Sequence, residues 1–293
     1  MPMKNRKRAG YHRGAVPIKN LDSIHIMCPY LLKNRTDSEV YISEQIDLSA
    51  IMTYLEKKNA EQPDFRYTFF HVIAAAIAKT MILRPHVNRY YSNKRLYQRK
   101  DVRLAFAAKK IFSDRGEETL VIYDYQNTTT FEDFHQDLKK QLTAIRSGKD
   151  NSTGDIISTL AKLPRPIFGF LMNTIYRLDQ KGWLPAALID HDPYHASVFL
   201  SNLGSIKLNA GYHHLTNFGT NSFFVVIGEK HRIFEPDDSG ILQAKEVLDL
   251  GFTLDERIAD GYYYSKTLKL LRYLLQNPEL LEFPAEKDVN YEQ

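Results

Sequence analysis

The chain has 293 residues, of which 43% are hydrophobic and 25% charged, and its formal net charge is +4. These values are typical of a soluble globular protein with one large or two small domains, and the scattered basic residues argue against nucleic-acid binding. A single cysteine, Cys28, excludes an intramolecular disulfide and a cysteine metal cluster, and no apolar run reaches the ~18 residues of a membrane span, so we expect a cytoplasmic protein.

Residues 1–20 are basic and loop-like, and we expect this segment to be flexible. The alternation of apolar and polar residues predicts a strand over 40–47, and a helix follows over 49–59. A second helix starts at Thr68 and ends before Pro85. Because this helix is apolar on most faces, it should be deeply buried.

The remaining expected elements are strands at 95–98, 102–108, 118–123, 196–200, 221–228 and 241–254, and helices at 130–145, 155–162, 166–179 and 262–276. They show no regular β-α-β alternation and no phosphate-binding glycine loop, which predicts an α+β layered fold. We expect one domain over residues 21–285 and a tail at 286–293. Cys28 and His71 are expected to be buried.

The segment FTLDERIADG, from Phe252 to Gly261, reads as a strand end, a charged turn and a helix start. Asp260 is a natural N-terminal cap, and Asp255 and Glu256 also favour a helix start. A turn this charged between two apolar elements indicates either a solvated corner or an active site. Composition alone leaves both interpretations open.

A second candidate is the turn SNLG, which closes a predicted strand. Ser201 can donate its hydroxyl into a cleft there, followed by Asn202 and the turn residue Gly204. It lacks the G-x-S-x-G context of a nucleophile, so its functional role would be that of an oxyanion donor, with a plain turn as the alternative. His213 and His214 are adjacent and therefore face different ways, and no third ligand stands at a telling spacing, so we expect no metal site.

Several segments, in order, resemble the catalytic domain of the 2-oxo acid dehydrogenase acyltransferases, which shares its fold with chloramphenicol acetyltransferase. The segments are VYISEQID, HVIAAAIAKTMILRPHVN, VRLAFAA, SVFLSNLGSI, VVIGEKHR and LDERIADGYYYSKTLKLLRYLLQNPELL. The resemblance covers roughly residues 35–282, and its specific anchors are SNLG and the motif that contains Asp260-Gly261. It implies a chloramphenicol-acetyltransferase-like two-layer α+β sandwich, with a mixed β-sheet covered by helices. It also implies a trimer whose active site lies between two subunits, with CoA and acceptor entering from opposite ends.

The family motif is His-x-x-x-Asp-Gly, and this chain carries Glu256 where the histidine is expected. In the family, the histidine removes the proton from a thiol or hydroxyl acceptor, which then attacks the acyl thioester. A serine at the Ser201 position donates to the oxyanion, and the aspartate at the Asp260 position makes a structural ion pair. We expect catalytic roles for Glu256, Ser201 and Asp260, and substrate-binding roles for Asn202, Gly204, His213 and His214. Acyl-CoA is the expected co-substrate, with no bound cofactor or metal.

A carboxylate is a weaker base than imidazole for this step. Taking a proton from a thiol is uphill by roughly 2.7 kcal/mol for histidine and roughly 6 kcal/mol for an unperturbed glutamate. Burial can raise a carboxylate pKa by ~3–5, so a buried Glu256 would be a workable base and a solvated one a poor base. His213 or His214 offers a second route, and the sequence does not choose between them.

The sequence contains no lipoyl domain or subunit-binding segment, and residues 150–193 form an enlarged segment that either lines an altered acceptor pocket or caps the core. We therefore expect a stand-alone acyltransferase that moves an acyl group from acyl-CoA to a small thiol, hydroxyl or amine acceptor. One alternative is a catalytically inactive homologue, a pseudoenzyme that acts as a trimeric scaffold or small-molecule binder. Another is a subunit recruited to a larger dehydrogenase assembly. Neither nucleic acid nor a membrane is an expected partner.

Overall fold

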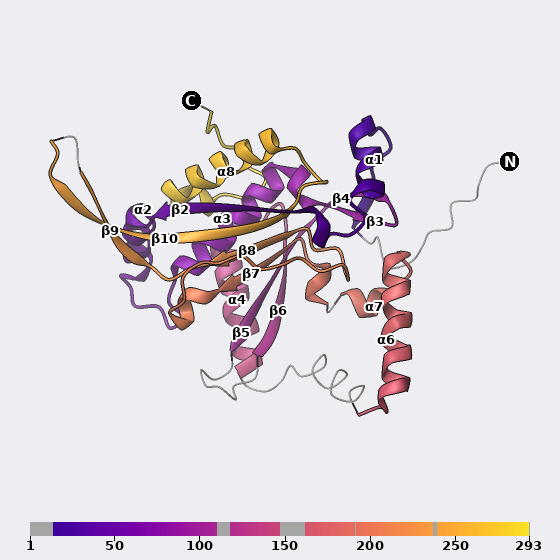
Figure 1. The fold of residues 1–293 in the computed structure, drawn as a ribbon. Coiled ribbons are helices and arrows are strands. Elements are labelled where there is room, and N and C mark those ends of the chain that lie inside the picture. Colours follow the sequence, from indigo (N-terminus) through magenta and orange to yellow (C-terminus); the bar gives the residue numbers. More distant parts are fainter. Residues whose placement is uncertain (1–13, 110–117, 147–161, 191, 237–238, 293) are drawn as a thin grey trace.

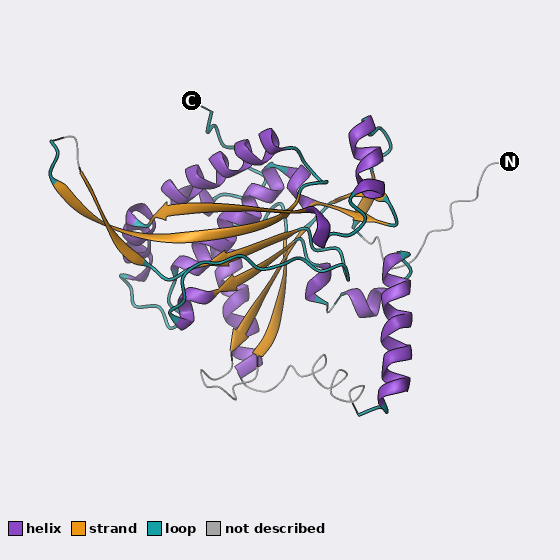
Figure 2. Cartoon of the chain, in the orientation of Figure 1, coloured by secondary structure: helices purple, strands orange, loops and turns teal. Residues whose placement is uncertain are grey.

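The computed structural model describes residues 14–109, 118–146, 162–190, 192–236 and 239–292 (Figures 1 and 2). Its strands are β1 (Ala15–Pro17), β2 (Glu39–Asp47), β3 (Arg89–Ser92), β4 (Arg95–Arg99), β5 (Val102–Lys109), β6 (Glu118–Tyr125), β7 (Val198–Asn202), β8 (Phe223–Ile227), β9 (His231–Pro236) and β10 (Leu242–Asp255). Its helices are α1 (Ser23–Leu31), α2 (Ser49–Asn59), α3 (Phe69–Leu83), α4 (Phe131–Arg146), α6 (Arg165–Gln180), α7 (Ala186–Ile189) and α8 (Gly261–Gln276).

The main sheet is mixed and has the strand order β2-β10-β8-β7-β5-β6, with β9 paired to β10. The β5–β7 and β7–β8 pairs are parallel, and the other pairs are antiparallel. Helices α2, α3, α4 and α8 pack together with this sheet in one hydrophobic core (Figure 1). The prediction of an α+β sandwich with a mixed sheet covered by helices is confirmed.

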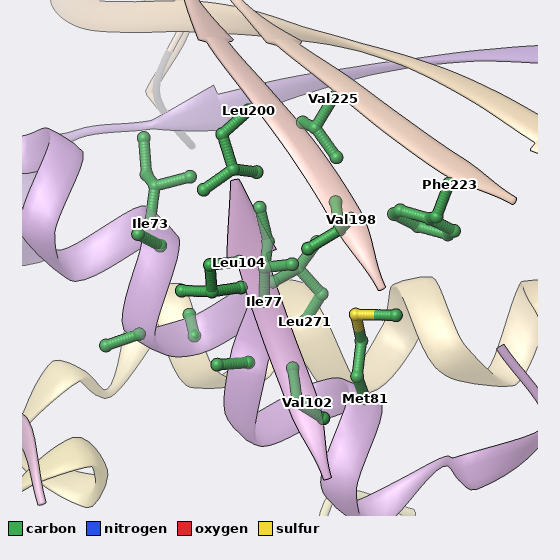
Figure 3. Packing of buried hydrophobic residues seen from close by; sticks show 14 of the residues in the cluster. Ile73, Ile77, Met81, Val102, Leu104, Val198, Leu200, Phe223, Val225 and Leu271 are labelled. Carbon is green, nitrogen blue, oxygen red and sulfur yellow. The ribbon is translucent and has the colours of Figure 1, made fainter. Parts of the chain in front are cut away.

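Helix α3 lies at the centre of the core. Ile73, Ile77 and Met81 face β5, β7 and β8, whose inward side chains include Leu104 and Val198 (Figure 3). The helix begins with a capping box, in which Thr68 and His71 each bind the other's backbone N–H. This contact keeps His71 at 4% exposure in the core, as predicted, and burial together with the nearby His135 lowers its pKa to about 3.

Several elements differ from the sequence prediction. Strand β1 lies in the segment expected to be loop-like, and α1, β3, α7 and β9 were not predicted. These elements are short. Strand β1 is held by backbone pairing with β4, which is distant in the chain, and β9 is held by backbone pairing with β10. In the predicted tail, Val289 and Tyr291 pack against the core. The helix predicted over 155–162 lies almost entirely outside the described residues.

Helix α6 stands apart from the main core (Figure 1). Its residues Ile175 and Leu178 join a separate small cluster around Leu184 and Ile189. Phe170 of the same helix is 75% exposed. Within the described part of the 150–193 segment, helix α6 therefore does not cap the main core. Among the described residues, no helix has the length and apolar character needed to cross a membrane.

Candidate active site

The charged turn predicted from FTLDERIADG joins β10 to α8. Strand β10 ends at Asp255, and α8 begins at Gly261. Asp260 is the N-cap, and its carboxylate accepts a 2.7 Å hydrogen bond from the N–H of Tyr263. The strand–turn–helix interpretation is confirmed.

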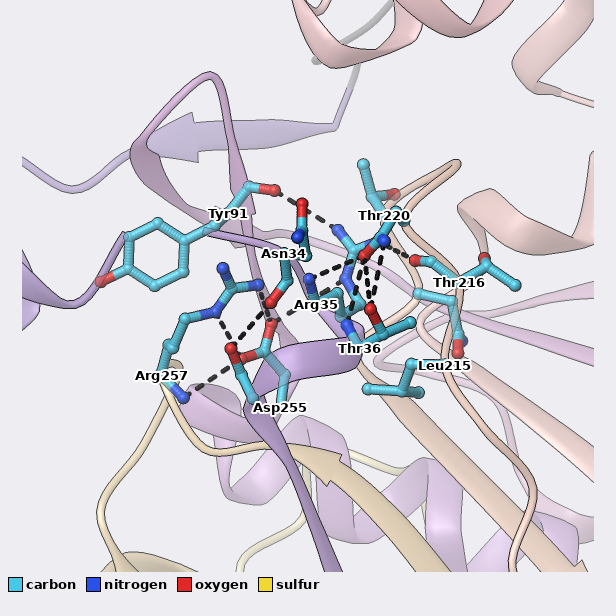
Figure 4. A network of polar contacts seen from close by, with 12 residues as sticks. Asn34, Arg35, Thr36, Tyr91, Leu215, Thr216, Thr220, Asp255 and Arg257 are labelled. Carbon is cyan, nitrogen blue, oxygen red and sulfur yellow. Dashed lines mark hydrogen bonds and ion pairs between the residues drawn. The ribbon is translucent and has the colours of Figure 1, made fainter. Parts of the chain in front are cut away.

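A buried ion-pair cluster holds this turn, formed by Asp255, Arg257 and Arg35 (Figure 4). The Arg257 guanidinium donates to both carboxylate oxygens of Asp255, at 2.8 Å from Nε and 2.7 Å from Nη2. Arg35 Nε lies 3.9 Å from the same carboxylate, and Arg35 Nη1 donates to the carbonyl oxygen of Thr216 at 2.6 Å. Burial by itself lowers the pKa of Arg257, but the contact with Asp255 outweighs it and the pKa is raised. We call these three side chains the Asp255 cluster.

The structure therefore places the ion pair of this turn at a different aspartate from the expected one. Asp260 is exposed and caps a helix, and no ion pair to it is found among the described residues. Asp255 is fully buried instead. The reason is local geometry: Asp255 and Arg257 both turn inward from the strand end, and Arg35 reaches the same carboxylate from the segment after α1.

Glu256 lies between two buried neighbours and is itself exposed. Its N–H donates to the carbonyl oxygen of Ser38 at 2.9 Å, which fixes the backbone at the turn. Among the described residues, no hydrogen bond or ion pair to its carboxylate is found, so Arg257 does not neutralise it. Its negative charge, after burial, raises the pKa of the Cys28 thiol. Cys28, expected to be buried, is half-buried because α1 lies outside the main core.

The SNLG turn closes β7. Ser201 is half-buried and shares a sheet face with Phe199, on the side away from the core helices, whereas Leu200 points into the core. A Cβ added at Gly204 would lie 2.5 Å from the carbonyl oxygen of Gly228, so only glycine allows the two chain segments to meet this closely. Asn202 Oδ1 is buried and has no partner among the described residues.

The loop over residues 207–222 covers part of this same face. A Cβ on Gly251 would lie 2.1 Å from the carbonyl oxygen of Gly211, so the loop backbone rests directly on β10. The His213 ring stacks on Phe224 at 4.2 Å between centroids, and Phe224 stacks on Phe199 at 4.9 Å. His213 is thereby held on the sheet face that carries Ser201.

Ser201 and Glu256 do not meet within one chain. Ser201 is paired with Val226, and Val226 with Gly251, which lies five residues before Glu256. Two strand spacings of ~4.8 Å and five residues of ~3.3 Å place Ser201 and Glu256 roughly 19 Å apart. The fold brings Ser201, Asn202 and Gly204 close to His213 and the adjacent His214. Glu256 and Asp260 lie at another edge of the sheet.

The close contact at Gly251 gives a direct test of this loop's position. Replacing Gly251 by alanine should lower the free energy of unfolding by about 1–3 kcal/mol, because the added methyl displaces the backbone of Gly211. Gly169 in helix α6 is the matched control: a Cβ added there would meet no neighbour within 4 Å, so alanine should stabilise by about 0.5–1 kcal/mol. Urea unfolding of both variants measures the difference, and equal effects would show that the loop does not rest on β10.

Two buried contacts between His195 and carboxylates anchor α6 and the following loop. His195 lies between two carboxylates, with Nδ1 2.5 Å from Asp192 and Nε2 3.1 Å from Asp179. The N–H of Gly219 also donates to Asp179, at 2.9 Å. Burial lowers the pKa of His195, but the two carboxylates outweigh it and the pKa is raised.

This pKa direction predicts a pH dependence. A histidine whose folded pKa lies above its unfolded value of about 6.5 contributes stability that is complete below that value and is lost as pH rises through the folded pKa. The His195→Gln variant should therefore lose stability mainly at acidic to neutral pH and approach the wild-type pH profile at alkaline pH. Thermal unfolding between pH 5.5 and 9 measures this, with His231→Gln as the partly exposed control. A pH-independent loss would assign His195 a packing role only.

No group of three His, Cys, Asp or Glu side chains arranged to hold a metal ion occurs in the part of the chain that the structure describes. His213 and His214 instead bind backbone carbonyl oxygens, of His214 and Leu215 respectively, through Nδ1. His191 lies outside the described residues.

Comparison with known proteins supports the resemblance. Residues 27–153 match the family model of the 2-oxoacid dehydrogenases acyltransferase (catalytic domain). A search of curated proteins found no match.

Solved structures share the fold. A probable dihydrolipoamide acetyltransferase from Listeria monocytogenes aligns with a TM-score of 0.57 and 10% identity, over 94% of this chain and 98% of that one. The cubic core of the pyruvate dehydrogenase multienzyme complex aligns with a TM-score of 0.57 and 15% identity, over 90% and 93%. Chloramphenicol acetyltransferase aligns with a TM-score of 0.53 and 13% identity, over 90% and 98%. The resemblance inferred from the sequence motifs is confirmed, and it extends to the fold of nearly the whole chain.

Proposed function

We propose that this protein is a stand-alone cytoplasmic acyltransferase that moves an acyl group from acyl-CoA to a small thiol, hydroxyl or amine acceptor. It acts as a homotrimer, and each active site lies between two copies. The acyltransferase fold and the match of residues 27–153 to the acyltransferase family model support this reaction class.

The observation that carries the proposal is the position of Glu256. The Asp255 cluster buries the residues on either side of it and leaves its carboxylate exposed, at the motif position where the family has its base. Buried ion pairs fix geometry even where their net contribution to stability is small. An exposed carboxylate on a turn fixed in this way supports a site that a second molecule completes.

The proposed site combines residues from two copies of the chain. Ser201 and Glu256 are roughly 19 Å apart in one chain, so a site that uses both takes Ser201 from one copy and Glu256 from the next. Covering Glu256 at the interface would remove it from water, which raises a carboxylate pKa and makes it a stronger base. In the free chain it is exposed and would be a poor base for a thiol.

The reaction then follows from these two positions. Glu256 accepts the proton of the acceptor, whose sulfur, oxygen or nitrogen attacks the thioester carbon of acyl-CoA. The Ser201 hydroxyl donates a hydrogen bond to the carbonyl oxygen as it gains negative charge. Collapse of the tetrahedral intermediate breaks the C–S bond, and the CoA thiolate takes back the proton from Glu256.

The runner-up is an inactive homologue, a trimeric scaffold or small-molecule binder. The observation in its favour is that the exposed carboxylate replaces an imidazole. A third arrangement keeps the activity but moves the base to His213, whose stacked position on Phe224 places it on the face of Ser201.

Mixing two inactive variants tests the shared site. Ser201→Ala and Glu256→Gln subunits, unfolded together and refolded at equal amounts, should recover about a quarter of wild-type activity, since one ordered pair in four at a cyclic interface carries both groups. Free thiol release from acetyl-CoA with a panel of acceptors measures this, and light scattering gives the assembly state. No recovery from a mixed trimer, with each variant inactive alone, would mean that both groups must come from the same copy and would contradict the shared site.

A further inference from the structure

A polar cavity of about 230 Å³ lies beside the charged turn, and Arg257 of that turn forms part of its wall. Its walls come from five separate parts of the chain: the end of α1 with the segment after it, the β3–β4 hairpin, the end of α6, the loop at 217–219, and the turn after β10. Neither Ser201 nor Glu256 lines it. It is therefore distinct from the proposed acyl-transfer site, although Arg257 of the same turn forms part of its wall.

Four cationic side chains among the described residues line this cavity, and they differ in depth. Arg35 and Arg257 are buried at 5% and 4% exposure, whereas Lys33 and Lys94 are exposed. The one carboxylate in this described lining is Asp179, and its oxygens already bind His195 and the N–H of Gly219. We call this site the basic cavity.

The guanidinium of Arg257 uses only some of its N–H donors within the described part of the chain. Of its five N–H groups, one on Nε and one on Nη2 bind Asp255, and one on Nη1 binds the carbonyl oxygen of Leu32 at 2.9 Å. Among the described residues, the other two N–H groups have no hydrogen-bond partner, so they can donate to a ligand. The neutral polar lining residues are Asn34, Ser92, Asn93, Gln180, Asn217 and Tyr91. The amide groups of Asn34, Gln180 and Asn217 already donate within the chain, to Asp37, Asn217 and Thr36 respectively.

Size limits the occupant. Pockets for drug-sized ligands occupy about 300–1,000 Å³, so this cavity suits a smaller molecule. The charge and donor pattern match an oxyanion, because guanidinium groups bind carboxylate and phosphate oxygens with two parallel hydrogen bonds.

We propose that the basic cavity is a binding site for a small oxyanion, a dicarboxylate or a phosphate, held by Arg257 at its base and by Lys33 and Lys94 at its rim. Because Arg257 also clamps Asp255, the bound anion stabilises the turn that presents Glu256. The site is separate from acyl-CoA binding, and its occupancy does not depend on whether the chain catalyses acyl transfer.

Calorimetric titration of the full chain with succinate and with inorganic phosphate, at constant ionic strength, tests the site and separates the two ligand sources. We expect one of them to bind at one site per chain and, at 100 times its dissociation constant, to raise Tm by about 3–6 °C. The double variant Lys33→Gln/Lys94→Gln should weaken binding at least about tenfold, since it removes two ammonium groups near the bound charge.

The matched control is Lys162→Gln/Lys269→Gln, which removes the same charge from exposed positions away from the cavity and should leave the affinity unchanged. Equal weakening by both double variants would mean diffuse charge attraction and would overturn the proposal, as would no binding of either anion. A final titration adds CoA to the anion-saturated protein. Competition between them would assign the cavity to CoA phosphates and overturn a separate site, whereas the anion result stands even if the chain shows no acyltransferase activity.

Discussion

Replacing Glu256 by glutamine should reduce acceptor-dependent thiol release from acetyl-CoA by at least about 100-fold, because a positioned general base contributes roughly 10²–10⁴-fold to rate. The amide has the same shape but accepts no proton, so the acceptor must ionise unaided. The side chain is exposed and unpaired by Arg257, so stability should change by less than about 0.5 kcal/mol. Initial rates at saturating acetyl-CoA, compared with Tm, separate the two effects.

The control is Glu279→Gln, an exposed glutamate after α8 that should leave the rate unchanged. Equal release by wild type and Glu256→Gln would move the base elsewhere, and His213→Gln and His214→Gln would be the next variants. No release by a folded wild-type trimer that binds CoA, with every class of acceptor, would favour the inactive homologue.

The neighbouring residue should behave in the opposite way. The Asp255→Ala variant should lower the free energy of unfolding by about 3–5 kcal/mol, because it leaves the guanidiniums of Arg257 and Arg35 buried without their shared carboxylate. For a chain of this size, that loss corresponds to a fall in Tm of roughly 5–8 °C. Urea unfolding and thermal unfolding both measure it.

A second variant shows whether the loss comes from uncompensated charge. In Asp255→Ala/Arg257→Met the buried charge of Arg257 is also removed, so the part of the stability lost through Arg257 should return, whereas Arg35 still lacks the carboxylate. The hydrogen bond from the Tyr264 hydroxyl goes to the carbonyl oxygen of Asp255, so it survives in both variants. If Asp255→Ala stayed within about 1 kcal/mol of wild type, that backbone contact, and not the ion pair, would be what holds the turn.

The exposure of Glu256 in the single chain also predicts how the activity depends on trimer assembly. A carboxylate in water is a poor base for a thiol, and one covered by a neighbouring subunit is a better base. Activity that falls on dilution along with the trimer is therefore an expected property of the proposed mechanism. Arg257 of the same turn lines the basic cavity, so an anion bound there would act on the position of Glu256.

Local sequence pattern was sufficient for the long elements and for the kind of turn that carries the candidate site. The continuous apolar run of α3 and its Thr68 cap, and the alternation in β2, report burial and hydrogen bonding between near neighbours in the chain. The strand–turn–helix unit around Glu256 has the same local origin. Short elements such as β1 lack this signal, since only pairing with β4 makes them strands.

The partners of the charged residues depended on contacts between distant segments. The family resemblance implied an ion pair at Asp260, but Arg35 and Arg257 meet at Asp255, because the fold brings the segment after α1 beside the end of β10. Periodicity indicates which side chains turn inward but not which distant side chain they meet. For the same reason, the exposure of Glu256, its separation from Ser201 and the basic cavity followed only from the tertiary structure.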